Sequence, residues 1–277
     1  MMNTIPDRIY AREPLGYRSG IPYFSHTTDY TENYEQISND HLSAMAKTGH
    51  NPWIREDIWQ SLEQSTIRFV KQYVRPGDAI LDVGVGTGRL LEQIPQIRPY
   101  GMDISFSYLE MTRAKGIDVC YSLIEDMPYT SNFFDVIVCT DVLEHVLDLH
   151  LCCTKILSVL KPGGVLIVRV PYREDLRLYV QEDFPYKYVH LRNFDECSLQ
   201  LLFEKVLGCE VLHSKAETLT PIVSRRKMEL PIDHRLIVLT LVMLRQISRP
   251  LAYAVASKLY YPLEINVVIR KPLNSGE

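Results

Sequence analysis

An aspartate and three alternate glycines occur together in AILDVGVGTGRLLEQI, residues 79–94. Because glycine has no Cβ, Gly84, Gly86 and Gly88 allow a sharp turn and a close approach of a ligand to the main chain. A helix beginning near Gly88 presents free N–H groups and its positive dipole end, which suit a carboxylate or phosphate. Asp82 just before the glycines would repel a pyrophosphate and attract an ammonium group. These residues predict a ligand with both charges, as in an amino acid.

A second carboxylate, Asp103, ends the stretch YGMD that follows the glycines. This is the position at which an acidic side chain accepts the hydroxyls of a ribose in doubly wound folds. The two stretches together predict an adenosine joined to an amino acid. A nicotinamide-dependent dehydrogenase is disfavoured, because its GxGxxG pattern would need glycine where this chain has Arg89.

Short apolar runs alternate with helical patterns around these residues, and each apolar run predicts a strand. The expected strands are 79–83, 99–103, 118–121, 135–140, 164–170 and 209–214, with EINVVIRK near the C-terminus as the last. The expected helices between them are 88–94, 106–115, 142–160 and 195–206. The alternation predicts an α/β, Rossmann-like doubly wound sheet, mostly parallel, with ligands at the carboxyl ends of its strands.

The rest of the chain divides into an arm, a domain and an insertion. Residues 1–50 are polar and tyrosine-rich without a sustained period, which predicts an irregular N-terminal arm or lid; residues 51–277 form the domain, beginning with one or two helices over 54–74. A helical insertion is expected at about 215–262. Its apolar run is too short to span a membrane. Two interpretations remain, helices packed over the sheet and a helix lying in a membrane interface.

The composition of the chain indicates which kinds of partner it is expected to bind. The net charge of −4 and the isoelectric point near 6.1 give no broad basic surface, so no nucleic acid is expected. The six cysteines show neither CxxC pairs nor Cys/His metal spacing, so no metal site is predicted. A polar, proline-containing N-terminus is unlike a signal peptide, and a cytoplasmic location is expected.

The sequence resembles the class I S-adenosylmethionine-dependent methyltransferases, specifically the small-molecule, type 11-like branch. The resembling pieces are LDVGVGTGRLL, GMDIS, IEDMPYTSNFFDVIVCTDVLEHV, LKPGGVLIVRVP and HLRNFDECSLQLLFEKVLGCEV, in the right order over about residues 65–214. The resemblance implies a seven-stranded sheet with an antiparallel last strand. It also implies S-adenosylmethionine as methyl donor and S-adenosylhomocysteine as product.

The resemblance further implies which residues contact the methionine and ribose portions of the donor. Asp82 would contact the ammonium group, directly or through water, and Asp103 would hold the ribose. The methionine portion would be approached by Gly84, Val85 and Gly86.

The adenine contacts follow from the same resemblance. Ile104 would pack on the ring, and Ile124 and Glu125 would occupy its edge. Family members often have an aspartate where this chain has Leu123, so Glu125 or Asp126 is expected to substitute for it.

Methyl transfer from a sulfonium is an in-line displacement, to which alignment of donor and acceptor contributes most. Thr140 and Asp141 would line the methyl-donor end. His145 and His190 are the candidate bases, each with the alternative of a structural or pocket-lining role. Asp141 or Glu144 would orient a histidine.

We therefore expect methyl transfer from S-adenosylmethionine to a small-molecule acceptor, foremost O-methylation of a sugar, glycolipid precursor or other metabolite. N-methylation of a small molecule is the nearest alternative. A non-catalytic S-adenosylmethionine-binding or membrane-associated partner protein, acting through residues 235–262, is another. Residues 1–50 and 172–192 are expected to close over the acceptor. The sequence leaves the acceptor atom, the pathway and the oligomeric state open.

Overall fold

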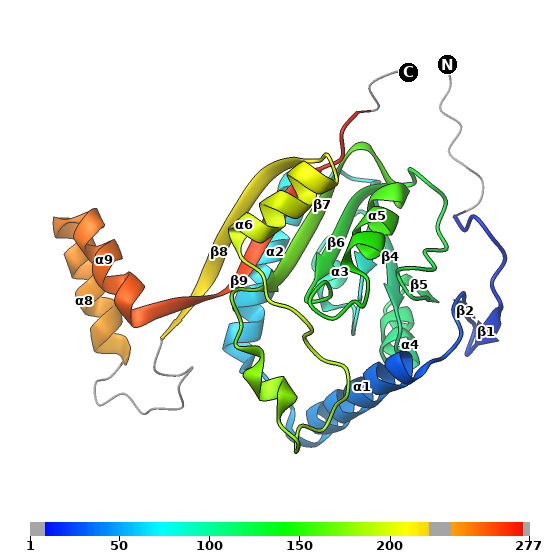
Figure 1. Ribbon diagram of the computed structural model, residues 1–277, viewed down its shortest axis with the longest axis horizontal. Helices are drawn as coiled ribbons and strands as arrows, with labels where there is room; N and C mark the ends of the chain where they lie inside the picture. The colour runs from blue at the N-terminus through cyan, green and yellow to red at the C-terminus, as the bar shows by residue number, and fades with distance from the viewer. Residues whose placement is uncertain (1–8, 222–233, 274–277) are drawn as a thin grey trace.

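Apolar runs buried on both faces form the centre of a sheet that helices cover on either side (Figure 1). The computed structural model describes residues 9–221 and 234–273. In the central strand β3 (Ala79–Val83), Ile80 packs with one layer of helices and Leu81 with the other. Burial on both faces is typical of parallel strands with helices on each side.

The described strands form one sheet in the order β1-β2-β5-β4-β3-β6-β7-β9-β8. The strands besides β3 are β1 (Gly16–Arg18), β2 (Ile21–Tyr23), β4 (Arg98–Asp103), β5 (Asp118–Tyr121), β6 (Phe134–Thr140), β7 (Leu160–Pro171), β8 (Glu210–Pro221) and β9 (Tyr260–Arg270). Strands β3 to β7 pair in parallel, whereas β9 is antiparallel to both β7 and β8. The seven strands from β5 to β8 confirm the expected sheet. The short pair β1 and β2 extends it beyond the expected seven, with β2 parallel to β5.

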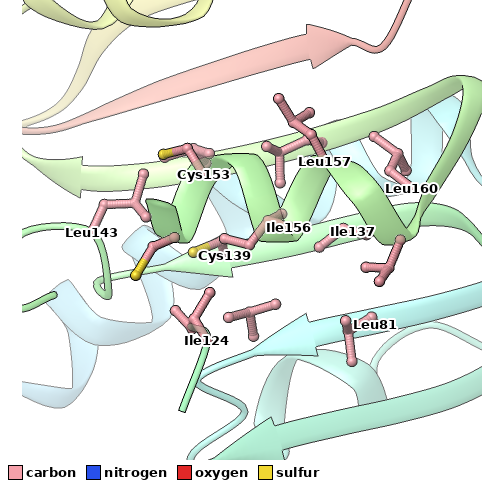
Figure 2. Close-up of a cluster of buried hydrophobic side chains, with 14 of the residues drawn as sticks. Leu81, Ile124, Ile137, Cys139, Leu143, Cys153, Ile156, Leu157 and Leu160 are labelled. Carbon is pink, nitrogen blue, oxygen red and sulfur yellow. The ribbon is translucent and has the colours of Figure 1, made fainter. Parts of the chain in front are cut away.

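Two layers of helices cover this sheet. One layer contains α2 (Glu56–Tyr73), α3 (Arg89–Glu92) and α4 (Phe106–Ala114). The other contains α5 (Leu149–Val159), α6 (Glu196–Gln200) and the π-helix η2 (Leu201–Val206); a short 3-10 helix, η1 (Leu176–Val180), precedes α6. Figure 2 shows Cys153, Ile156 and Leu157 of α5 over Ile137 and Cys139 of β6.

The helix expected at 142–160 is shorter than predicted. It begins at Leu149, because the Asp148 side chain accepts a hydrogen bond from the Leu151 N–H and caps it. The preceding residues form turns, and Asp141 has a φ of 55°, in the left-handed region. His145 therefore lies in a turn at the end of β6 and not on a helix.

The prediction of an irregular arm over residues 1–50 is also wrong in part, because α1 (Asp29–Thr48) is a helix of 20 residues. A capping box at Thr28 begins it and Gly49, in the left-handed conformation, ends it. Its buried residues are polar: Thr31, Asn33, Ser38 and His41. An apolar period was absent from the sequence for this reason.

The insertion contains two helices, α8 (His234–Ile247) and α9 (Arg249–Leu259). They pack on each other at the end of the long antiparallel ribbon of β8 and β9, away from the rest of the molecule (Figure 1). The interpretation of helices packed over the sheet is therefore wrong. Within the described ranges, no helix has the length and apolar character needed to cross a bilayer.

Candidate active site

A cavity of about 420 Å³ lies at the carboxyl ends of β3, β4 and β6, where the doubly wound sheet predicts it. Many of the predicted site residues line it: Gly84, Gly86, Asp103, Ile104, Ile124, Glu125, Asp141 and His145. The N-terminal part of the chain supplies aromatic and histidine side chains to the same cavity: Tyr30, Tyr34, His41, Trp53 and Trp59. The cavity therefore lies between the strand ends and the segment from α1 to α2.

The three glycines after β3 have different roles. A Cβ on Gly84 would lie 2.4 Å from the Val142 side chain, and one on Gly88 would lie 2.9 Å from Thr112. Those two glycines are therefore required by protein packing. A Cβ on Gly86 meets no protein atom within 4 Å, and Gly86 lines the cavity. Gly86 is the glycine at which a ligand can approach the main chain.

Asp103 fixes the shape of the cavity at the end of β4. One carboxylate oxygen accepts the Gly86 N–H at 2.9 Å, and the other accepts those of Ile104 and Ser105 at 2.8 and 3.0 Å. Burial raises the pKa of Asp103 to about 6, although the three N–H donors act in the opposite direction. Asp103 thus connects the glycine loop to the end of β4, and it also lines the cavity.

Asp82 is buried beneath this loop and does not line the cavity. Its Oδ1 atom has no hydrogen-bond partner. Burial is the main cause that raises the pKa of Asp82 well above its usual value, and the negative charge of the nearby Asp103 raises it further. The positive charge of Arg169 lowers this pKa by a smaller amount. The predicted contact of Asp82 with an ammonium group stays a prediction.

Three further predicted contacts, Val85, Asp126 and Thr140, are not among the residues that line the cavity. Val85 packs against Gly101, and its N–H donates to the Met102 carbonyl. Asp126 accepts a hydrogen bond from the Ser25 hydroxyl at 2.7 Å. Of the two acids that could replace the missing aspartate, Glu125 is the one at the cavity wall.

His145 lies at the end of the cavity beside β6. Its Nδ1 is 3.0 Å from the Tyr34 hydroxyl, and its ring meets that of His190 edge to face, with centroids 4.5 Å apart. Burial, and then the neighbouring His190, lower the pKa of His145 to about 3. The imidazole of His145 is consequently neutral near pH 7.

His190 does not line the cavity itself but stands directly behind His145. The Glu174 carboxylate contacts its Nδ1, and the Tyr179 hydroxyl lies 3.4 Å from the same atom. Two histidines separated by 45 positions in the sequence thus come together. Only the folding of the segment after β7 could reveal this proximity.

The two acids that were expected to orient a histidine behave differently. The Asp141 carboxylate forms a bidentate pair with the buried Arg169, so its partner is a guanidinium and not an imidazole. Glu144 lies with Oε1 4.0 Å from His145 Nε2, and neither of its buried oxygens has a hydrogen-bond partner. Burial and the nearby Asp141 raise the pKa of Glu144 well above its usual value.

Sequence reasoning missed the aromatic wall that α1 and the next segment supply. His41 donates or accepts through Nδ1 to the Tyr108 hydroxyl at 2.7 Å, and Trp59 stacks under the Arg89 guanidinium at 3.7 Å. The unusual density of tyrosine between positions 10 and 34 was the available signal. It could not be assigned to a cavity without the helix that presents it.

These features fit S-adenosylmethionine. The carboxylate of Asp103 ends β4, the position at which an acidic side chain accepts ribose hydroxyls in doubly wound folds. Gly86 leaves open space beside the backbone, and the cavity volume falls in the range of about 300–1,000 Å³ typical of small-ligand sites. The sheet order with an antiparallel strand inserted at one edge, together with this site, defines the class I methyltransferase fold.

Comparisons with known proteins agree with the assignment of the methyltransferase fold. The methyltransferase domain family, type 11, matches residues 81–168. The chain is 32% identical over 156 residues to a ubiquinone/menaquinone biosynthesis C-methyltransferase of Saccharophagus degradans, covering 49% of this chain and 63% of that protein. It is 26% identical over 140 residues to a probable tRNA methyltransferase 9B of Bos taurus, covering 47% of this chain and 31% of that protein.

Solved structures share the fold. A phosphoethanolamine N-methyltransferase 2 of Haemonchus contortus, in complex with phosphomonomethylethanolamine and S-adenosylhomocysteine, superposes with a TM-score of 0.53 at 15% identity, covering 89% of this chain and 61% of that one. Residues 81–168 thus match the type 11 methyltransferase domain, the chain has the class I methyltransferase fold, and S-adenosylmethionine is the cofactor that this match supports.

Proposed function

We propose that the chain transfers the methyl group of S-adenosylmethionine to a hydroxyl group of a small molecule. The observation that carries this proposal is a cavity with the donor residues Gly86 and Asp103 in one part and Tyr30, Tyr34 and His145 in another. The cavity volume suits a small-molecule site, and the net charge of −4 does not favour a nucleic-acid substrate.

A hydroxyl acceptor must lose a proton as it is methylated, whereas an amine needs little more than alignment. His145 lines the acceptor part of the cavity, and His190, whose Nδ1 contacts the Glu174 carboxylate, packs directly behind it. Imidazoles can take up the proton of a hydroxyl, and His145 is the member of this pair that reaches the cavity. This arrangement favours O-methylation over the N-methylation alternative.

We further propose that α1, from the segment 1–50, and the segment 172–192 close over the acceptor. Asn33 of α1 donates to the Tyr188 carbonyl at 2.7 Å and accepts the N–H groups of Lys187 and Tyr188 at 2.9 and 3.1 Å. The Tyr186 hydroxyl donates to Asp40 of the same helix. The two segments predicted to form the lid are thereby connected to each other.

A second activity, contact with an anionic membrane surface, is favoured by the α8–α9 hairpin. Leu236, Leu239, Met243 and Ile247 recur along one side of α8 and are more than half exposed. The sequence from 234 to 263 has arginine and lysine but no aspartate or glutamate. An apolar face with positive charges suits the interface of an anionic bilayer.

The test of methyl transfer is to incubate the purified full chain with S-adenosylmethionine and a panel of sugars, phenols and amines, and to measure mass gain by one CH₂ unit. Methylation of a hydroxyl compound, absent with Gly86→Val, is the expected result. Methylation of amines alone would favour the N-methylation alternative. A chain that binds the donor but methylates no member of a broad panel, while tRNA gains a methyl group, would contradict the small-molecule proposal.

A further inference from the structure

Three side chains that are good metal ligands converge behind the acceptor end of the cavity. Within the described part of the chain, Glu144, His145 and His190 each offer a ligand atom, and these atoms all lie within 4.8 Å of one another. Ligands of a tetrahedral zinc site, bound at about 2.0–2.1 Å, are separated by about 3.4 Å. Side-chain rotations that move the ligand atoms by roughly an ångström would bring the three groups to that spacing.

The outer contacts of both histidines match those of metal-binding imidazoles. Nδ1 of His190 meets the Glu174 carboxylate, and Nδ1 of His145 meets the Tyr34 hydroxyl at 3.0 Å. His190 therefore has Nε2 left as its ligand atom, and Nε2 of His145 is the ring atom that lies 4.0 Å from Glu144, although the His145 ring also forms a hydrogen bond with the Val189 backbone. Metal-bound histidines generally use their other nitrogen in such a hydrogen bond, which fixes the ring and its tautomer.

Glu144 supplies an independent observation. Its side chain is 1% exposed, and both carboxylate oxygens are buried without a hydrogen-bond partner, with Oε1 only 4.0 Å from His145 Nε2. A buried carboxyl group without hydrogen-bond partners is destabilising, because its lost hydration is not replaced. A cation between Glu144 and the two imidazoles would satisfy it.

We propose that Glu144, His145 and His190 bind a divalent transition-metal ion, for which Zn²⁺ is the best match. Two imidazoles and one carboxylate are the ligands of an open zinc site, in which the fourth position remains for a water molecule or a substrate oxygen. His145 lines the cavity, so the open position lies toward the acceptor. This step rests on the proposed O-methylation: the ion would hold the acceptor oxygen and lower the pKa of its hydroxyl group, whose proton passes to water, and the oxygen then takes the methyl group as the S–CH₃ bond breaks and S-adenosylhomocysteine leaves.

The experiment titrates chelator-treated full chain with Co²⁺, followed by its visible absorption, and then displaces Co²⁺ with Zn²⁺. We expect one equivalent to bind, and Glu144→Gln and His190→Gln to weaken binding at least about tenfold. Glu174→Gln should weaken it about 10- to 100-fold through the outer contact. The matched control is His150→Gln, since His150 is an exposed histidine on α5; it should bind as the wild type does.

S-adenosylhomocysteine binding, measured by calorimetry on the same variants, reports whether each is folded. Unchanged metal affinity in both Glu144→Gln and His190→Gln, no Co²⁺ binding by a wild type that binds S-adenosylhomocysteine, or displacement of Co²⁺ by equimolar Mg²⁺ would each overturn the assignment. Failure of the wild type to bind S-adenosylhomocysteine would instead contradict the proposed function, whatever the metal does.

Discussion

Gly84, Gly86 and Gly88 all have positive φ, yet only Gly86 has open space where a side chain would be. We expect Gly86→Val to weaken S-adenosylhomocysteine binding at least about tenfold, because the side chain would fill the cavity at the backbone. Gly116→Val is the matched control: Gly116 also has positive φ and no atom within 4 Å of its Cβ position, but it is exposed and does not line the cavity. Equal affinity of the two variants in calorimetry would refute the role of Gly86.

A pH dependence follows from Asp103. Its pKa is raised to about 6 by burial, so the carboxyl group is mostly neutral at pH 5 and mostly charged at pH 7. A charged carboxylate accepts stronger hydrogen bonds from hydroxyl groups than a neutral carboxylic acid does. We expect donor affinity to rise about tenfold from about pH 5 to about pH 7, because the charged fraction rises by about that factor.

The control for this profile is Asp103→Asn, which has no titrating group and should show a flat dependence with weaker binding. Calorimetry at several pH values distinguishes the cases. A wild type whose profile matches that of the variant would show that Asp103 does not contact the donor.

The position of a residue at the cavity was predictable from the sequence where one strand end decides it, as for Gly86, Asp103 and Glu125. It was not predictable where a distant segment decides it. Asp126 meets Ser25 of the N-terminal segment, and Asp141 meets Arg169 of β7. The convergence of Glu144 and His145 with His190 likewise depends on how the chain returns after β7.

At the scale of elements, α1 is held to the segment after β7 by Asn33. We expect Asn33→Ala to destabilise this contact by about 1–3 kcal/mol, because two N–H groups and one carbonyl lose their partner. Hydrogen exchange at Lys187 and Tyr188 should accelerate accordingly. Asn39→Ala, at an exposed position of the same helix, should leave that exchange unchanged. Equal exchange in both variants would contradict the proposed connection of the lid.

The elements of the sheet were largely predictable because their apolar runs are buried by both helix layers. Strands β3 and β5 have the predicted bounds. Helix α1 was not predictable from periodicity, because it buries threonine, asparagine, serine and histidine through hydrogen bonds and aromatic contacts. A helix that packs against the rest of the protein through polar side chains shows no apolar stripe in its sequence.

At the scale of the whole molecule, the α8–α9 hairpin stands apart from the sheet (Figure 1). Its helices expose apolar side chains. We expect the full chain to float with liposomes containing anionic lipid, and Met243→Glu to reduce this binding several-fold by placing a negative charge on the exposed face. Val206→Glu, an equal change at an exposed apolar residue of the main body, should bind as the wild type does. Negligible flotation of the wild type would contradict the membrane proposal.

The sequence indicated the position of this insertion but not its projection from the molecule. The apolar residues of α8 were compatible with packing on the sheet, the interpretation that the sequence favoured, as well as with a membrane interface. The extension of β8 and β9 as a paired ribbon, up to Pro221 opposite Tyr260, carries the helices beyond the sheet core.

The most direct measurement is calorimetry of the purified full chain with S-adenosylhomocysteine, repeated with Asp103→Ala and Asp126→Ala. We predict binding by the wild type, a loss of about 1–3 kcal/mol for Asp103→Ala because a charged hydrogen-bond acceptor is removed, and little change for Asp126→Ala, which lies outside the cavity. Absence of binding by the wild type, or equal affinity of wild type and Asp103→Ala, would contradict the assignment of the cavity as the donor site.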